Sequence, residues 1–173
     1  APVIERYLGR IQQAMPEGRI QVMTSAGGLQ GAQTFFPKDS LLSGPAGGVV
    51  GAAGVARACG IDRILTLDMG GTSSDVARYD QGFDYVFETQ VGPAQLLSPA
   101  VAVETVAAGG GSCCTFDGQK LAVGPESAGA TPGPACYGAG GPLTLTDVNL
   151  LLDRLDPATV SIPLDRQVAQ RAL

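Results

Sequence analysis

A short glycine-rich stretch between two acidic residues carries the clearest chemical signal in this sequence. The apolar run Ile64–Leu67 leads into Asp68, the segment 70–73 reads Gly-Gly-Thr-Ser, and Asp75 follows. Glycines lack a Cβ, so their backbone N–H groups can approach an anion closely, and the threonine and serine add hydroxyl donors. Asp68 can hold Mg²⁺ through water, because this hard cation prefers oxygen ligands. The pattern predicts a phosphate-binding loop with a metal ion beside it.

The same residues are also compatible with an ordinary hairpin turn, in which glycines adopt positive φ and an aspartate caps the turn. In either case we expect a buried strand at Ile64–Leu67, a tight loop, and a second strand over Val76–Tyr79. A P-loop is excluded, because no Gly-x4-Gly-Lys-Ser/Thr segment occurs in the sequence. The neighbouring segments decide between the two interpretations.

Composition indicates an ordinary globular chain. Of 173 residues, 45% are hydrophobic and 16% are charged, while 25 glycines cluster in loops without a period. We therefore expect a glycine-loop-rich α/β or α+β protein. The net charge of −5 without a basic patch argues against nucleic acid or an anionic membrane as partner. No apolar run approaches 18 residues, which also argues against a membrane span.

The cysteines and the missing histidines narrow the chemistry further. The four cysteines lack metal-ligand spacing, and the adjacent pair Cys113 and Cys114 is not expected to form a disulfide. A reduced, cytoplasmic protein fits this usage. The absence of histidine removes Ser-His-Asp and Cys-His catalysis and histidine-bound metals. The sequence has no initiator methionine, and a helix over Asp165–Leu173 is cut short, so we interpret it as an internal piece of a longer polypeptide.

Helical spacing and glycine loops place further elements in the first third of the sequence. We expect an amphipathic helix over Val3–Met15, a strand over Arg19–Thr24, and an ordinary turn at Ser25–Gly28. A second helix runs from Ser43 to Cys59. Its glycines at 44, 47, 48 and 51 share one face, which indicates either close packing of another element or a ligand at the helix start.

The rest of the sequence contains strands separated by glycine-rich loops. Strands are expected over Phe83–Thr89 and Val101–Ala107, and the triple glycine at 109–111 then implies close approach of the backbone to a ligand or to another chain segment. Asp117-Gly118 predicts a hairpin between strands 114–117 and 120–123. The proline-rich stretch Gly124–Gly138 is expected to be an ordered functional loop. A short strand at 143–145 and a helix capped by Thr146-Asp147 and ended by Pro157 follow.

Several long blocks in fixed order resemble the hydantoinase/oxoprolinase family. The resemblance runs from about Val22 to Pro157. The matching blocks are Leu42–Gly51, Asp68–Val76, Thr105–Ser112, Val123–Ala130, Pro132–Tyr137 and Leu145–Asn149. The segments Tyr85–Glu88 and Thr105–Ser112 look closer to ATP-dependent 5-oxoprolinase than to the N-methylhydantoinase or acetone carboxylase branches.

The resemblance implies an α/β protein with part of an actin-like, RNase H-like ATPase fold, and it assigns residues 1–173 to the interior of a hydantoinase A-type ATPase domain. The implied activity is ATP-driven, Mg²⁺-dependent opening of a cyclic amide. The missing remainder of the chain, or a hydantoinase B-type partner in an oligomeric parent, would complete the enzyme. Because the family needs a second phosphate loop, we expect no ATP turnover by this piece alone.

The resemblance also implies roles for individual residues. Asp68–Asp75 resembles the second phosphate loop of the actin-like fold, with Asp68 orienting Mg²⁺ or water. The implied catalytic residues are Asp68 and Asp75, the implied cofactor-binding residues are Gly70, Gly71, Thr72 and Ser73, and the residues of an implied substrate or interlobe loop are Gly109, Gly110, Gly111, Ser112 and Glu126. Two other interpretations stay open: a nucleotide-binding module without chemistry, and a segment whose glycines only permit close packing.

Overall fold

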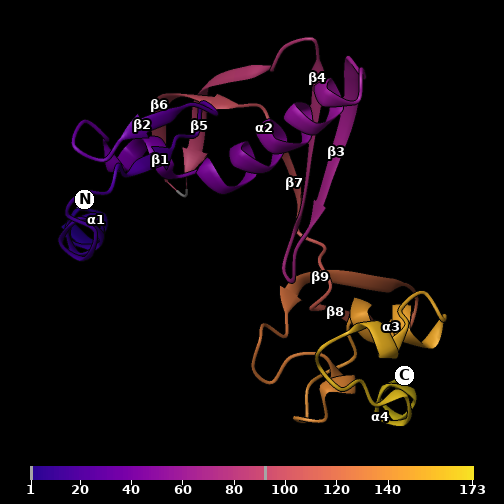
Figure 1. Ribbon diagram of the computed structural model, residues 1–173. Coiled ribbons are helices and arrows are strands. Elements are labelled where there is room, and N and C mark those ends of the chain that lie inside the picture. Colours follow the sequence, from indigo (N-terminus) through magenta and orange to yellow (C-terminus); the bar gives the residue numbers. More distant parts are fainter. Residues whose placement is uncertain (1, 92) are drawn as a thin grey trace. The chain divides into compact units, whose positions relative to one another are not determined.

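The computed structural model describes residues 2–91 and 93–173, which form two compact units. The first unit contains residues 1–68 and 76–104, and the second contains residues 69–75 and 105–173. The helices and strands are labelled in Figure 1.

The first unit begins with helix α1 (Pro2–Ala14) and a hairpin of β1 (Gln21–Met23) and β2 (Leu29–Gly31). The hairpin is antiparallel, and its turn is closed by the Thr24 N–H, which donates to the Gly28 carbonyl at 2.9 Å. The expected helix and turn are therefore confirmed as elements, and the expected strand over 19–24 is confirmed but shorter, since β1 spans only Gln21–Met23. A short 3₁₀ helix, η1 (Pro37–Ser40), leads into α2 (Ser43–Ala58), which begins and ends as its proline and glycine signals predicted.

A second antiparallel hairpin of the first unit joins β5 (Tyr85–Val91) to β6 (Ala94–Val101) (Figure 1). The sequence predicted β5 but not β6, because Pro99 argues against a strand in a regular sheet and no clean alternation precedes it. The predicted strand over 101–107 is correspondingly wrong in its bounds. Val101 ends β6, and a separate short strand, β7 (Glu104–Val106), follows.

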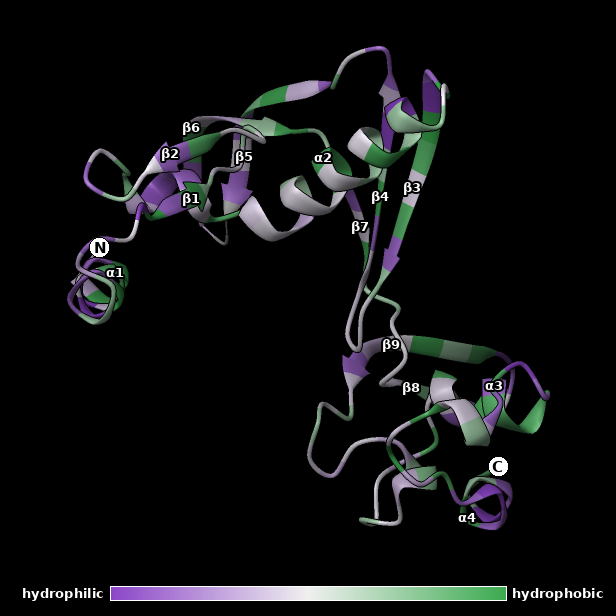
Figure 2. Ribbon diagram, viewed as in Figure 1, coloured by the Kyte–Doolittle hydropathy of each residue, from purple (hydrophilic) through white to green (hydrophobic). Residues whose placement is uncertain are grey.

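A three-stranded sheet has the order β3-β4-β7, with β3 at Arg63–Met69 and β4 at Ser74–Asp80. The residues of these strands are divided between the two units. The expected strand–loop–strand arrangement is confirmed, but β3 is not buried as predicted. Leu65 and Leu67 are 77% and 72% exposed, because alternate side chains of a strand point to opposite faces. Figure 2 shows that the middle of β3 is coloured as hydrophobic.

The main core cluster of the first unit consists of alanines and valines. Ala46 and Val49 of α2 pack with Ala77 of β4 and Val101 of β6, and each is at most 5% exposed. Small residues on the helix allow it to lie close to its neighbours. The core therefore fixes α2 and the strands that carry these residues as one body within the first unit.

The second unit contains the hairpin of β8 (Ser112–Phe116) and β9 (Leu121–Ser127), with Gly118 at φ 93° in its turn. The Asp117-Gly118 signal is thereby confirmed. β9 continues four residues beyond the predicted end at Val123, so the segment 124–127 is strand rather than loop. The remainder of that stretch carries turns and the 3₁₀ helix η2 (Ala135–Tyr137).

Helices α3 (Leu145–Leu151) and α4 (Arg166–Ala172), with the short 3₁₀ helix η3 (Pro157–Thr159) between them, complete the second unit. Leu150, Ala169 and Cys136 form its buried core. Asp165 caps α4 as predicted, whereas the predicted cap of α3 is wrong. Thr144 is the N-cap residue, and Thr146 and Asp147 lie in the first turn, because the Thr144 N–H and hydroxyl bond to the Asp147 carboxylate.

None of the helices within residues 2–91 and 93–173 has the length and apolar composition needed to cross a membrane.

Candidate functional site

The predicted phosphate loop is a tight connection between β3 and β4. The Gly70 N–H donates to the Ser73 carbonyl at 2.8 Å and closes the turn. Thr72 at its tip is exposed, and Ser73 is half-buried. The residues 70–73 thus form a defined turn of four residues that includes both glycines.

The triple glycine packs its backbone directly on this turn, within the second unit. The Gly110 N–H donates to the Gly70 carbonyl at 2.9 Å, and the Gly111 N–H donates to the Gly71 carbonyl at 2.6 Å. A Cβ on Gly109 would lie 2.6 Å from the Thr72 nitrogen and 2.7 Å from the Gly70 oxygen, closer than real Cβ contacts. The expected close approach is therefore confirmed for another chain segment, and that segment is the phosphate loop itself.

Three hydroxyl groups hold the triple glycine in place around the turn. The buried Ser112 hydroxyl accepts from the Gly109 N–H at 2.8 Å. The Thr146 hydroxyl and N–H both donate to the Gly110 carbonyl at 2.8 Å. The Ser74 hydroxyl donates to the Ala108 carbonyl at 2.6 Å. These bonds hold the loop pair, that is, the turn at 70–73 and the triple glycine at 109–111, in one arrangement. Its backbone conformation is therefore set before any ligand binds.

The sequence did not identify Ser74, Thr146 or Ser127 as part of this arrangement. Ser127 ends β9, where its hydroxyl accepts from the Thr72 hydroxyl at 3.4 Å and from the Gly129 N–H at 3.2 Å. Their contacts with the loop pair join residues 34 to 55 positions apart, so no local sequence pattern predicts them. Thr146 did stand out locally, but as a helix cap.

The two predicted catalytic carboxylates have different surroundings. Asp75 is half-buried in β4, and its Oδ1 accepts a 2.6 Å hydrogen bond from the Thr105 hydroxyl of β7. This bond ties β4 to β7 and orients the carboxylate. Asp75 is therefore held in one position by its neighbour.

Asp68 lies near the end of β3 and is exposed. A Cβ on Gly48 of α2 would lie 3.8 Å from its Oδ2, so the helix backbone passes close to the carboxylate. Within the part of the chain that the structure describes, no side chain or backbone group pairs with Asp68. Its oxygens are available to water or to a hydrated cation.

The glycine face of α2 is less closely packed than its composition suggested. Gly47 lies under Met23 of β1, and a Cβ there would be 3.6 Å from that side chain. Gly44 and Gly51 have open space around them within the described residues. At Gly47 and Gly48 a Cβ would make only ordinary van der Waals contacts, so close packing within the described residues requires glycine at none of the four positions. A ligand at the helix start stays a prediction.

Glu126 is exposed on β9, and the structure does not bring it to the loop pair through any contact. The predicted role of Gly109–Ser112 and Glu126 in a substrate or interlobe loop stays a prediction. No group of three or more acidic or cysteine side chains able to hold a metal occurs among residues 2–91 and 93–173.

A buried carboxylate organises the polypeptide next to α3. Asp147 is 0% exposed and accepts from the N–H groups of Ala135 at 3.1 Å, Cys136 at 2.7 Å and Thr144 at 2.7 Å. Burial alone would raise the pKa of Asp147, but hydrogen bonds from Cys136 and Thr144 outweigh burial and hold this pKa below its ordinary value. The carboxylate stays charged and fixes η2 against α3.

The cysteines form no disulfide among the described residues, and two of them have raised thiol pKa values. Burial, together with the neighbouring Asp147 carboxylate, raises the pKa of Cys136 to about 12. Burial also raises the pKa of Cys114, with smaller contributions from Asp147 and Cys113. Thiols that stay protonated are poor nucleophiles, so these residues have a structural role.

Comparison with protein families gives one match over the whole chain. The hydantoinase/oxoprolinase family model matches residues 1–173. Among curated proteins, 5-oxoprolinase PfmaA of Pestalotiopsis fici is 48% identical over 161 residues, which covers 89% of this chain and 12% of that protein. This chain therefore spans only a small part of the length of that relative.

Two solved structures share the fold. The ATP-dependent caprolactamase from Pseudomonas jessenii matches with a TM-score of 0.81 and 37% identity over 99% of this chain and 26% of its own. The nucleotide-free structure of acetone carboxylase matches with a TM-score of 0.80 and 30% identity over 97% of this chain and 25% of its own. The expected fold class, an α/β segment of an actin-like ATPase fold with glycine-rich loops, is confirmed.

Proposed function

Because the chain belongs to the hydantoinase/oxoprolinase family, we propose that it is an internal segment of the ATPase domain of an ATP-dependent enzyme that opens cyclic amides. The proposed substrate is 5-oxoproline, and the proposed product is glutamate. The similarity to a 5-oxoprolinase at 48% identity supports this branch over the caprolactamase and acetone carboxylase branches, at 37% and 30% identity.

One observation carries the proposal: the turn of residues 70–73 is locked by backbone hydrogen bonds from Gly110 and Gly111. A preorganised loop of backbone groups can bind phosphate oxygens without a further ordering cost. A simple hairpin turn does not need a second glycine loop packed on its first two residues. The arrangement therefore supports a phosphate-binding role for this turn through Gly71 and Thr72, whereas the Gly70 N–H is used to close the turn.

The donor set fits ATP with Mg²⁺ better than a protein-caged metal. Mg²⁺ keeps several waters and is bound through one or two carboxylates together with substrate phosphates. Asp68 is exposed and without a partner among the described residues, so it suits this mode of binding. In the proposal, Asp68 holds the hydrated cation, and Asp75, oriented by Thr105, stabilises the loop from its far end.

The chain's own contribution is to position and to stabilise charge. Bound ATP would supply a phosphoryl group to the amide oxygen of the ring, which makes the amide carbon open to attack by water. The ring C–N bond would then break, its nitrogen would take a proton, and phosphate would be released, so that 5-oxoproline, ATP and water give glutamate, ADP and phosphate. The loop at residues 70–73 would hold the phosphate in line, and the hydrogen bonds of Gly110, Gly111 and Ser74 would prevent the loop from yielding as charge develops.

The experiment that tests this function is ATP hydrolysis by the full-length parent protein with and without 5-oxoproline. Stimulation by 5-oxoproline, with glutamate released in equal amount, is the expected result. Stimulation by a hydantoin or by a larger lactam would replace the substrate but keep the mechanism. No hydrolysis with any cyclic amide would leave a nucleotide-binding module without chemistry.

The proposal extends to the isolated segment and to its parent protein. The 173-residue segment alone does not turn over ATP, because its candidate loop needs a second phosphate loop from the rest of the domain. The parent works in the cytoplasm with Mg²⁺ and as an oligomer, either as a single long chain or with a hydantoinase B-type partner. Steady ATP hydrolysis by the isolated segment that Asp68→Ala abolishes would contradict its expected inactivity.

A further inference from the structure

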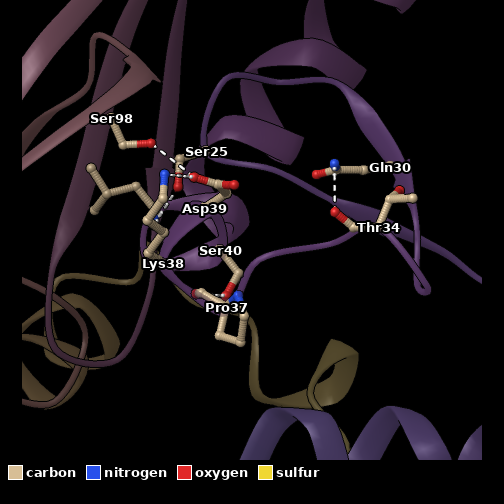
Figure 3. Close-up of polar contacts among 9 residues, drawn as sticks. Ser25, Gln30, Thr34, Pro37, Lys38, Asp39, Ser40 and Ser98 are labelled. Carbon is tan, nitrogen blue, oxygen red and sulfur yellow. Dashed lines mark hydrogen bonds and ion pairs between the residues drawn. The ribbon is translucent and has the colours of Figure 1, made fainter. Parts of the chain in front are cut away.

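A pocket of about 330 Å³ with several polar side chains in its lining lies in the first unit, where the β1–β2 turn, η1 and β6 meet. It is lined by Thr24, Gln30, Lys38, Asp39, Ser98 and Pro99, among others. Figure 3 shows the polar side chains at this place, with Asp39 between Lys38 and Ser98. A volume of this size suits a small organic ligand with a few placed polar groups.

Asp39 is the central charge of the pocket. Its Oδ1 accepts from Lys38 Nζ at 2.7 Å and from the Ser98 hydroxyl at 2.9 Å (Figure 3). The hydrogen bond from Lys38 is the main reason that the pKa of Asp39 lies below its ordinary value, against the opposing effect of burial. Within the described residues, no group donates to Oδ2. Asp39 therefore offers one charged acceptor to a ligand.

Lys38 supplies the complementary donor. Its side chain is 55% exposed, while that of Asp39 is 21% exposed, so the ammonium lies nearer to the solvent. One of its three N–H groups is used on Asp39, and no other residue that the structure describes accepts from the remaining two. The pocket thus presents an acceptor and a donor next to each other, with no net charge between them.

The frame around this pair is fixed by Ser25, which is 4% exposed. The Ser25 N–H donates to the Asp39 carbonyl at 2.6 Å, and its hydroxyl accepts from the Leu42 N–H at 3.0 Å. Its carbonyl accepts from the Val101 N–H at 2.8 Å, at the end of β6. Three elements are thereby joined at one residue, so the pocket is formed before a ligand binds.

We propose that this pocket binds a small cyclic amide through the cis edge of the amide group. In a ring of five to seven atoms, the N–H and the C=O lie on the same edge of the amide, whereas an open-chain secondary amide places them on opposite edges. The N–H would donate to Asp39 Oδ2, and the C=O would accept from Lys38. The ring methylenes would lie along the apolar wall that Pro99 and Ala26 provide.

This inference rests on the proposed function, since cyclic amides are its substrate class, but it concerns a separate set of residues. The phosphate loop needs none of the pocket residues for its own hydrogen bonds. Binding to the pocket can therefore be measured without nucleotide.

The test is saturation-transfer NMR on the full-length parent without nucleotide, with 2-pyrrolidinone as the probe and N-methylacetamide as the open-chain comparison. We expect 2-pyrrolidinone to bind at least about tenfold more tightly than N-methylacetamide, since only the ring places both groups on one edge. Lys38→Gln and Asp39→Asn should each weaken binding of 2-pyrrolidinone by at least about tenfold. Lys120→Gln, on the exposed β8–β9 turn, is the matched control and should leave binding unchanged.

Equal binding of the two amides, or binding that survives Lys38→Gln, would overturn the proposal. Lys38 is exposed, so this variant tests the pocket even where Asp39→Asn fails to fold. Failure of the proposed function would look different: 2-pyrrolidinone would still bind in a Lys38-dependent manner, while no cyclic amide would stimulate ATP hydrolysis.

Discussion

Gly109 lies against the peptide that joins Gly71 to Thr72, with room for a hydrogen atom but not for a methyl group. A Cβ at Gly109 would come within 2.6 Å of the Thr72 nitrogen and 2.7 Å of the Gly71 carbonyl carbon. Both neighbours are backbone atoms, which cannot swing away as a flexible side chain can. The shape of the candidate phosphate loop therefore depends on a glycine 38 positions after Gly71.

Gly109→Ala should consequently displace the loop. In the full-length parent we expect loss of nearly all ATP hydrolysis, because a shift of about 1 Å at a positioning element can reduce a rate by about 100-fold. The measurement is steady-state hydrolysis of ATP. Gly54→Ala is the matched control, because Gly54 lies in α2 with open space around it, and alanine there should preserve activity. Equal activity of the two variants would show that the loop does not bind phosphate.

Asp68→Ala should remove ATP-coupled ring opening in the full-length parent without loss of the fold. The carboxylate is exposed and pairs with no described residue, so its removal leaves no buried group unsatisfied. Activity and thermal unfolding should be measured together, over a range of Mg²⁺ concentrations. Asp62→Ala, an exposed aspartate just before β3, serves as the control. A rate unaffected by Asp68→Ala would remove Asp68 from the site.

Asp147→Ala should lower the free energy of unfolding by about 3 kcal/mol, because it leaves buried N–H donors without an acceptor. Asp165→Ala removes an exposed helix cap and should cost only about 1 kcal/mol. Denaturant unfolding of both variants tests the difference. Similar losses would mean that Asp147 acts as a local cap only.

The same carboxylate predicts a pH dependence. The pKa of Asp147 is lower in the folded state than in the unfolded chain, where the pKa of an aspartate is about 3.9. Its contribution to stability is therefore present above about pH 4 and is lost as the pH falls through the folded-state pKa. Unfolding should be measured between pH 7 and pH 2. The wild type should lose more stability on acidification than Asp147→Ala, and parallel curves would contradict this assignment.

Thiol labelling should distinguish the cysteines. Cys59 is exposed, whereas Cys136 is 1% exposed and has a pKa of about 12. At pH 8 iodoacetamide should modify Cys59 in the native protein and should reach Cys136 only after denaturant is added. Mass spectrometry of the labelled peptides provides the measurement. Rapid native labelling of Cys136 would show that the second unit opens around η2.

Local sequence signals predicted many elements correctly but failed where distant residues decide. The Pro45 and Gly60 signals placed α2, and Asp117-Gly118 placed the β8–β9 turn, because capping and turn geometry depend on adjacent residues. The same signals did not predict β6, because Pro99 is typical of a break in a strand. They also predicted the cap of α3 at Thr146, whereas the N-cap residue is Thr144. The exposure of Leu65 and Leu67 was also missed, because an apolar run does not reveal which face is covered.

The sequence by itself determined the family, the position of the candidate phosphate loop and the two carboxylates that flank it, since these depend on residue types at fixed spacing. Only the tertiary structure decided what the triple glycine does. It brings Gly109–Gly111 onto residues 70–72 and adds Ser74, Ser127 and Thr146 through hydrogen bonds across 34 to 55 positions. It also showed that the two carboxylates differ: Asp75 accepts a hydrogen bond from Thr105, whereas Asp68 pairs with none of the described residues. The physical reason is that glycine permits close approach of any partner, and the path of the folded chain selects which partner it is.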